Sequence, residues 1–313
     1  MTRWCIQGSG PWPIITWRFV VANGPVKRLL GKLLIVGGDS MIGAALADHF
    51  KALGWQVQAT TRRQDQVDDN HPFLDLASPR LDLPAADVVI LAAAVARIGA
   101  CEKDPVATRR INVDGTLAVA EYMAGQGAHI LLLSSDKAFD GTVPLRARTD
   151  TPGPACEYGR QKAAAEAGVL ALGEQGAVLR LSKVVEPSLE LLQDWAKDLA
   201  AGQAITPFHD LYLAPVPVEL VAEVTTHIAE ECAGGIYHCT GGEDRSYVDL
   251  ARILAMESGY DPALIQPGSC QTADIPAAAR PRYTSLEMTL EQSRWGIAAP
   301  AFEATALSII KRK

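Results

Sequence analysis

The sequence predicts an α/β fold: a doubly wound parallel sheet that carries a small C-terminal lobe. Short apolar runs alternate with stretches of helical periodicity from Lys32 to about Leu181, as in sheets covered by helices on both faces. The first apolar run, Leu33–Val36, ends directly in Gly37 and Gly38, which is typical of a buried parallel strand that turns into a helix. Past Leu181 the alternation loosens and Pro-containing loops separate the helices, so we expect a second, smaller lobe there.

The individual elements follow from local patterns. Met41–Leu53 has apolar residues at helical spacing and stops at Gly54, as a helix should. The first half is further expected to hold strands over Gln56–Thr60, Asp87–Leu91, Ile130–Leu133 and Val178–Leu181, and helices over Pro105–Ala124 and Glu157–Leu170. Helices of the second half are expected near Leu189–Ala201, Val218–Glu230, Tyr247–Ser258 and Leu286–Trp295.

Composition excludes several classes of protein. Of the 313 residues, 48% are hydrophobic, which argues against disorder for the bulk of the chain. The formal net charge of -7 disfavours nucleic-acid binding, and no apolar run reaches the length of a membrane-spanning helix. The cysteines are scattered with no C-x-x-C pair, so we expect reduced thiols, no metal site and a cytoplasmic location.

The glycine-rich turn after the first strand is a candidate dinucleotide site. It runs from Gly37 to Gly43 with a G-x-x-x-x-x-G spacing and opens a helix. Glycines let the backbone approach a pyrophosphate, and free N–H groups at a helix start point at it. The alternative is a tight turn that binds nothing, which the charge of Asp39 mildly favours. The residues expected to bind the cofactor here are Gly37, Ser40, Met41, Ile42 and Gly43.

The second strand is followed by Arg62 and Arg63 rather than by an acidic residue. An acid at this position holds a ribose 2′-hydroxyl, whereas arginine accommodates a 2′-phosphate. NADP(H) is therefore favoured over NAD(H). The alternative is that both arginines are simply solvated.

A second constellation joins Ser135, just past the end of an expected strand, to Tyr158 and Lys162. Tyr158 and Lys162 are four apart on an expected helix, so their side chains project from one face. A tyrosine needs a nearby cation to exchange protons readily at neutral pH, and Lys162 is placed to supply that field. The hydroxyl of Ser135 is placed to hold a carbonyl oxygen that the tyrosine protonates.

From Lys32 to about Lys311 the chain resembles the extended short-chain dehydrogenase/reductases, and within them the dTDP-4-dehydrorhamnose reductase-like group of sugar-nucleotide enzymes. The stretches that carry the resemblance are Leu34–Gly43, Phe73–Leu76, Asp87–Ala94, Ile111–Thr116, Ser134–Gly141, Tyr158–Lys162, Gly235–Gly241 and Ala279–Leu286.

The resemblance implies a site and a reaction. Ser135, Tyr158 and Lys162 would be the catalytic triad, with Tyr158 and Lys162 also at the cofactor and Lys162 on its nicotinamide ribose. The remaining cofactor contacts would come from Asp75 and Leu76 at the adenine and from Ala92, Ala93 and Ala94 along the cofactor. The implied chemistry is hydride transfer from NAD(P)H to a keto carbon of a nucleotide-linked sugar, with Tyr158 as the proton donor.

Comparison with other enzymes of the superfamily narrows the expected activity, and some positions differ from the reductase pattern. Dehydratases of the superfamily have an Asp-Glu pair after the catalytic serine or threonine, whereas Asp136 is followed here by Lys137. Phe139-Asp140-Gly141 sides with the reductases over the 4-epimerases. Lys183–Pro187 and Pro207–Asp210 replace the usual substrate-reading residues. Lys183 and Arg280 are our candidates for a substrate pyrophosphate.

These observations predict an enzyme that reduces a 4-keto nucleotide sugar with NADPH in polysaccharide precursor synthesis, with a homodimer as a possible assembly. The alternatives are a nucleotide-sugar epimerase and a non-catalytic dinucleotide-binding regulatory or scaffold subunit. We expect residues 1–30 to be a poorly ordered extension whose apolar stretch fits a secretory signal badly. Residues 31–182 would form the NADP-binding core, and residues 183–313 mainly a substrate-binding lobe with returning core elements.

Overall fold

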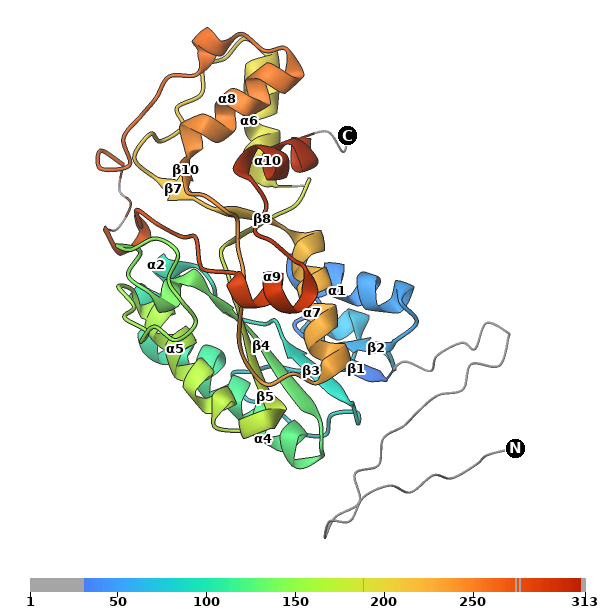
Figure 1. Cartoon of the computed structure of the whole chain (residues 1–313). Helices are drawn as coiled ribbons and strands as arrows, with labels where there is room; N and C mark the ends of the chain where they lie inside the picture. Colours follow the sequence, from blue (N-terminus) through green and yellow to red (C-terminus); the bar gives the residue numbers. More distant parts are fainter. Residues whose placement is uncertain (1–30, 188, 274, 276, 311–313) are drawn as a thin grey trace.

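The central sheet has six parallel strands, which confirms the predicted fold class. The computed structural model describes residues 31–187, 189–273, 275 and 277–310, so the expectation for residues 1–30 lies outside the described residues. The strands run in the order β2-β1-β3-β4-β5-β9 (Figure 1). They are β1 (Lys32–Val36), β2 (Gln56–Ala59), β3 (Val88–Leu91), β4 (His129–Ser135), β5 (Gly176–Leu181) and β9 (Gly235–Cys239).

The strand order places a switch point between β1 and β3. From β1 the chain moves outward to β2, and it then returns to the other side of β1 and continues through β3, β4 and β5. In open α/β sheets, ligands bind outside the carboxyl ends of the strands at such a point. The glycine turn after β1 lies at this edge.

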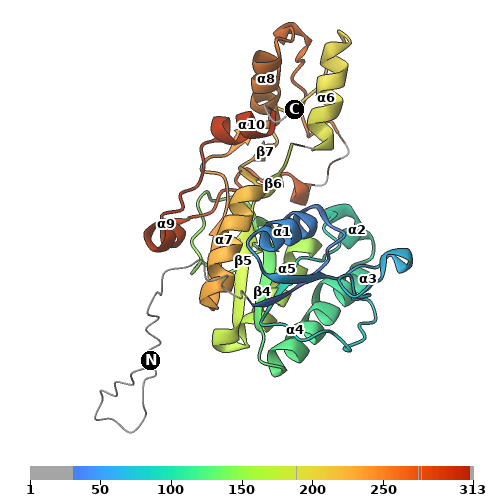
Figure 2. The ribbon, with the colours of Figure 1, turned by 90° about the vertical axis from the view of Figure 1, so that its right-hand side faces the viewer.

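Helices cover both faces of the sheet. Leu33 and Ile35 of β1 pack in one core with α1 (Met41–Ala52) and α7 (Val218–Glu231). Leu34 and Val36, which point the other way because side chains alternate along a strand, pack in a second core with α4 (Thr116–Gly125) and α5 (Glu157–Leu170). Figure 2 shows α1 and α7 side by side, and the two helices are in contact.

The single helix expected over Pro105–Ala124 is wrong. The structure has α3 (Pro105–Arg109), a π-helical turn (Arg110–Gly115) and then α4, with the additional helix α2 (Ile98–Lys103) before them. The π turn buries Asn112. Its side chain forms hydrogen bonds with the backbone of Val95, which follows β3. The π turn also brings Gly115 so close to Leu76 that a Cβ there would overlap the Leu76 carbonyl oxygen.

The smaller lobe has a core of its own. It is built from α6 (Glu190–Ala200), α8 (Tyr247–Ser258) and α10 (Phe302–Ile310), the last of which was not predicted. Two short sheets pair β6 (Lys183–Val185) with β8 (Pro215–Pro217) and β7 (Tyr212–Leu213) with β10 (Arg245–Ser246). The helix expected from Leu286 begins only at α9 (Thr289–Trp295), because Leu286 is held in an extended bridge to Arg146. Single 3₁₀ turns lie at Gln64–Gln66, Asp136–Ala138, Gly173–Gln175, Pro262–Leu264 and Ala277–Ala279.

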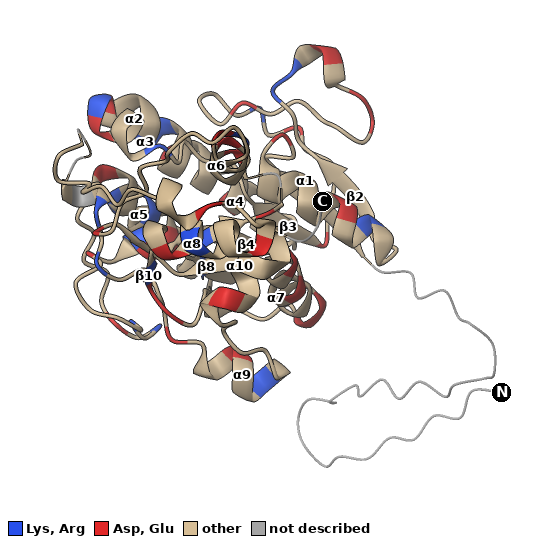
Figure 3. Cartoon of the chain, turned by 90° about the horizontal axis from the view of Figure 1, so that it is seen from above, with Lys and Arg blue, Asp and Glu red and all other residues tan. Residues whose placement is uncertain are grey.

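Figure 3, which views the ribbon from above, shows positions of Lys and Arg interspersed with positions of Asp and Glu. Within the described ranges, no helix is both long and apolar enough to cross a membrane. The same part of the chain brings together no group of three or more His, Cys, Asp or Glu side chains that could hold a metal ion.

Candidate functional site

The turn after β1 is built for close backbone approach. Gly37 has a φ of +99°, a conformation that favours glycine, and a Cβ there would stand 2.8 Å from Ala93. A Cβ on Gly43 would overlap the Gly37 carbonyl oxygen. Ser40 caps α1: its hydroxyl accepts from Gly43 N at 3.0 Å and donates to Gly37 O at 2.8 Å. The helix therefore starts with its N–H groups directed at the carboxyl edge of the sheet.

Asp39 is engaged with the loop after β2. Its carboxylate accepts hydrogen bonds from Thr61 Oγ1 at 2.9 and 3.0 Å and from Arg62 N at 3.0 Å. Arg63 Nε lies 4.0 Å from the same carboxylate. The negative charge that argued against phosphate binding in the sequence is thus used to fix the arginine loop.

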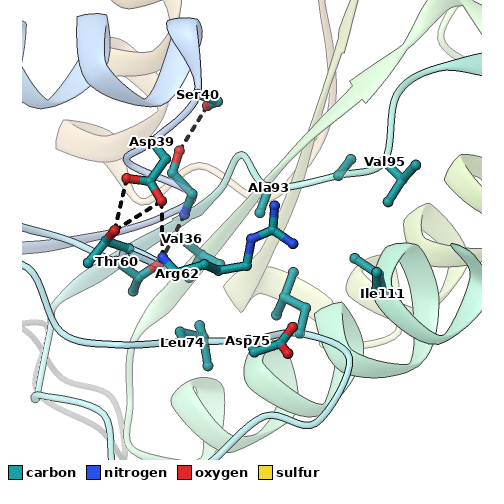
Figure 4. A pocket seen from close by; sticks show the side chains of 14 residues that line it. Val36, Asp39, Ser40, Thr60, Arg62, Leu74, Asp75, Ala93, Val95 and Ile111 are labelled. Carbon is teal, nitrogen blue, oxygen red and sulfur yellow. Dashed lines mark hydrogen bonds between the residues drawn. The ribbon is translucent and has the colours of Figure 1, made fainter. Parts of the chain in front are cut away.

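A cavity of about 240 Å³ lies between this turn, the arginine loop and β3. Figure 4 shows the Arg62 side chain extending across it, with Asp75 on the opposite wall from Asp39. Of the expected cofactor residues, Gly37, Ser40, Arg62, Asp75, Leu76, Ala93 and Ala94 line this cavity. Arg63 and Phe73 line a more open cavity of about 590 Å³ that shares Asp39, Arg62 and Asp75 with it. The glycine cradle and these polar groups fit the diphosphate and ribose of a dinucleotide.

Six expected cofactor residues do not line either cavity: Met41, Ile42, Gly43, Ala92, Tyr158 and Lys162. Met41 is exposed at the start of α1, and Gly43 is buried where it packs on the turn. Ala92 N continues the β-ladder by donating to Val36 O at 2.9 Å. Their part in cofactor binding stays a prediction.

Ser135, Tyr158 and Lys162 come from neighbouring elements of the core. Ser135 ends β4, while Tyr158 and Lys162 lie one turn apart at the start of α5, which packs against β4. Ser135 Oγ donates to Asp136 Oδ1 at 2.9 Å. Lys162 is buried, and its Nζ donates to Leu133 O at 2.6 Å.

The electrostatic environment keeps the phenol of Tyr158 protonated. Burial raises its pKa, the negative charge of Asp136 adds to this effect, and a hydrogen bond with Ser135 opposes it. Burial also lowers the pKa of Lys162 to about 8, against the attraction of Glu166. A neutral phenol at neutral pH suits a proton donor rather than a base.

Two buried amides, Asn112 and Gln161, link the segment after β3 to α5. Both lie in stretches that carry the family resemblance, but the sequence analysis assigned no role to either. Asn112 Oδ1 accepts from Val95 N at 2.7 Å, and its Nδ2 donates to Val95 O at 3.0 Å. The same Nδ2 donates to Gln161 Oε1 at 2.8 Å. Gln161 stands next to Lys162 on α5, so this chain of bonds orients the helix that carries Tyr158. Nothing in the local periodicity marks Asn112, because the π turn that buries it is a tertiary feature.

Lys183 lies close to the end of β4 that carries Ser135. It follows β5, whose Leu181 is paired with Ser135. Its pKa is lowered by desolvation and then by the positive charge of Lys137, although its accessible area makes it an exposed residue. Lys137 itself pairs with Asp136.

Arg280 belongs to a different segment. The backbone N–H groups of Arg282 and Tyr283, just after it, donate to Gly141 O at 3.1 and 2.9 Å. The Arg280 side chain contacts the thiol of Cys270. Its Nε is buried without a hydrogen-bond partner among the described residues. Its role in substrate binding stays a prediction.

Tyr247, at the start of α8, was not expected at the site. Burial raises its pKa, and the charge of Asp136 adds to this effect, which places the phenol near the residue that follows Ser135. Its ring meets Trp195 edge-on, with centroids 6.5 Å apart. The smaller lobe thus contributes one aromatic side chain, that of Tyr247, whose charge state responds to Asp136.

Comparison with known proteins identifies one family over the described chain. The model described as the RmlD substrate binding domain matches residues 31–313. Methionine adenosyltransferase 2 subunit beta of Xenopus laevis is 28% identical over 267 residues, covering 80% of this chain and 78% of that protein. The dTDP-4-dehydrorhamnose reductase of Aggregatibacter actinomycetemcomitans is 27% identical over 290 residues, covering 86% of this chain and 94% of that protein.

Solved structures share the fold. The dTDP-4-dehydrorhamnose reductase from Bacillus anthracis str. Ames, in complex with NADP, has a TM-score of 0.78 at 18% identity and covers 90% of this chain and 99% of its own. MoeE5, in complex with UDP-glucose and NAD, has a TM-score of 0.74 at 21% identity, covering 90% and 98%. At these identities the likeness shows the fold alone.

Proposed function

This chain belongs to the RmlD substrate binding domain family, and we propose that it is an enzyme that reduces a 4-keto nucleotide sugar with NADPH. The single observation that carries the proposal is the contact of Ser135 with Tyr158, which lies one helical turn from Lys162 on α5. Ser135 ends β4 and the other two start α5, which packs on β4. A carbonyl placed at this edge is within reach of a hydroxyl and a protonated phenol.

Ser135, Tyr158 and Lys162 have separate roles in the proposed reduction. The Ser135 hydroxyl binds the keto oxygen and orients it toward Tyr158. When bound, the cofactor supplies the hydride to the keto carbon. The phenol of Tyr158 gives its proton to the oxygen, which becomes the alcohol, and the ammonium group of Lys162 stabilises the phenolate that is left. The amide chain from Val95 through Asn112 to Gln161 holds the helix in register.

The choice of NADPH over NADH rests on the arginine loop. Arg62 and Arg63 follow β2, and Asp39 holds the backbone of Arg62 in place. Guanidinium groups there are suited to a 2′-phosphate. Arg62→Ala should weaken NADPH binding by about 10-fold or more, the loss expected for a charged hydrogen bond, and leave NADH binding nearly unchanged. Equal weakening of both cofactors would assign the arginine to another part of the dinucleotide.

The experiment that tests the function follows the absorbance of the reduced nicotinamide. Purified protein and NADPH are mixed with a dTDP-4-keto-6-deoxy sugar, with NADH in a parallel reaction and the Tyr158→Phe variant as the control. Rapid oxidation by the wild type and none by the variant is the expected result. Product formation without net consumption of NADPH would instead identify an epimerase.

A second candidate is a non-catalytic subunit. The relative named methionine adenosyltransferase 2 subunit beta is as similar in sequence as the reductase, so membership of the family does not by itself require catalysis. A stoichiometric partner protein recovered with the chain, together with NADPH binding and no turnover of any keto sugar, would favour this candidate. The presence of Ser135, Tyr158 and Lys162 together favours the enzyme.

A further inference from the structure

Two lysines stand beside the catalytic serine because of the strand register. β4 and β5 are parallel neighbours in which Ser135 is paired with Leu181. Lys137 and Lys183 each come two residues after a member of that pair, so both extend from the same point of the sheet edge. Lys183 then begins β6, where it pairs with Pro215 of the smaller lobe.

The two lysines differ in how their charge is balanced. Lys137 Nζ lies 2.5 Å from Asp136 Oδ2, and both side chains of this pair are largely buried. The side chain of Lys183 is accessible. Among the described residues it has neither an ion-pair partner nor a side-chain hydrogen bond. The Asp136–Lys137 pair is neutral, so the positive charge of Lys183 stands in excess next to Ser135.

An excess charge of this kind has a physical cost that a ligand can remove. Desolvation lowers the pKa of Lys183, and the neighbouring Lys137 charge lowers it further. An anionic group placed against the ammonium balances its charge and favours its protonated form. The position therefore suits a negatively charged group of the substrate.

The location of Lys183 decides which group of a nucleotide sugar this would be. Ser135 and Tyr158 meet the reacting keto oxygen at carbon 4, and Lys183 extends from the strand next to Ser135. In a hexose, the group on carbon 5 is adjacent to the keto carbon, while the diphosphate on carbon 1 lies across the ring. A carboxylate on carbon 5 is thus closer to the reacting carbon than either phosphate is.

We infer that the site prefers acidic nucleotide sugars to neutral ones, because the carboxylate on carbon 5 of a uronate-type sugar pairs with Lys183 next to the reacting carbonyl. Because Lys137 is paired with Asp136, Lys183 is the cation of the two that is available to this carboxylate. The inference rests on the proposed function, because it takes the Ser135–Tyr158 edge as the place of the reacting carbon. It replaces the sequence-based assignment of Lys183 to a substrate pyrophosphate with a role in sugar selectivity.

The test compares ligands that differ only in the carboxylate. The full chain, saturated with NADP⁺, is titrated by calorimetry with UDP-glucose and UDP-glucuronic acid, and with the two thymidine counterparts. We expect the glucuronic acid derivatives to bind about 10- to 100-fold more tightly, the gain of a hydrogen bond between charged groups. Lys183→Gln should bring the paired ligands to within about twofold of each other, and Lys183→Arg should retain most of the difference.

The control is Lys197→Gln, which removes the same charge from an exposed position on α6 and should keep the wild-type preference. Equal affinity of the wild type for both sugars would overturn the inference. So would a Lys183→Gln variant that weakens both ligands to the same extent, since the lysine would then meet the diphosphate. Failure of the proposed function would differ from both: none of the nucleotide sugars would bind while NADP⁺ still did, and the inference would fall with it.

Discussion

Replacing Gly43 by alanine tests whether the turn after β1 needs its glycines for packing. The added Cβ would overlap the Gly37 carbonyl oxygen and would stand 2.9 Å from Ser40 Oγ. Neither neighbour can yield freely, because Gly37 is backbone and Ser40 Oγ caps α1 by accepting from Gly43 N. The first turn of the helix must therefore move away from β1.

The expected magnitude follows from two losses. Overpacking of this kind costs about 1–3 kcal/mol, and disturbance of a serine cap costs about 1 kcal/mol. Gly43→Ala should thus lower the free energy of unfolding by about 2–4 kcal/mol. Since the displaced turn carries Gly37 and Ser40, which line the cavity, NADPH affinity should fall by about 10-fold or more, a loss comparable to one charge-assisted hydrogen bond.

The assay is urea unfolding of the two proteins, followed by titration with NADPH under native conditions. Gly125→Ala is the matched control: Gly125 ends α4, and a Cβ there would meet nothing within 4 Å. Alanine at a helical position of this kind is expected to be neutral or to stabilise the protein by up to about 1 kcal/mol. If Gly43→Ala were as stable as Gly125→Ala and bound NADPH equally well, the packing argument for the turn would be refuted.

Three further predictions concern the residues around α5. Tyr158→Phe should lower kcat by about 100- to 10,000-fold, as expected for loss of a general acid, with NADPH affinity within about twofold in a fluorescence titration; loss of cofactor binding would contradict the assigned role. The pKa of Lys162 is 10.5 in the unfolded chain, and burial lowers it to about 8 in the folded protein. Between these two pH values the unfolded state binds more protons than the folded state. The free energy of unfolding therefore rises with pH over this range. Urea unfolding from pH 7 to 10 should therefore show the wild type gaining up to about 3 kcal/mol relative to Lys162→Met, and a pH-independent difference would disprove the burial of the charge. Glu166→Gln leaves Arg180, whose side chain is 1% exposed, without its carboxylate partner and should lower the free energy of unfolding by about 3–5 kcal/mol. The control Glu157→Gln breaks the more exposed pair with Arg160 and should lower it by less than about 1 kcal/mol. Equal losses would show that burial of the ion pair has no energetic consequence.

Local patterns were sufficient to predict most of the fold. The apolar run of β1, the glycines after it and the helical spacing of α1 are each contained in a few consecutive residues, so they can be recognised without knowledge of the partner elements. The same holds for α5, whose four-residue spacing placed Tyr158 and Lys162 on one face. Prediction failed over Pro105–Ala124, where the helical period continues through the sequence although the backbone inserts a π turn.

The sequence by itself determined which residue types the site contains: a glycine turn, two arginines, a serine at a strand end and a Tyr–Lys pair. Only the tertiary structure decided how they are connected. Asp39 is bound to the loop that carries Arg62. Asn112 joins Val95, after β3, to Gln161 of α5. Lys183 comes close to Lys137 through the pairing of β4 with β5. These relations depend on strand register and on contacts between residues far apart in the chain. Their energies arise from burial and charge, which no stretch of consecutive residues specifies.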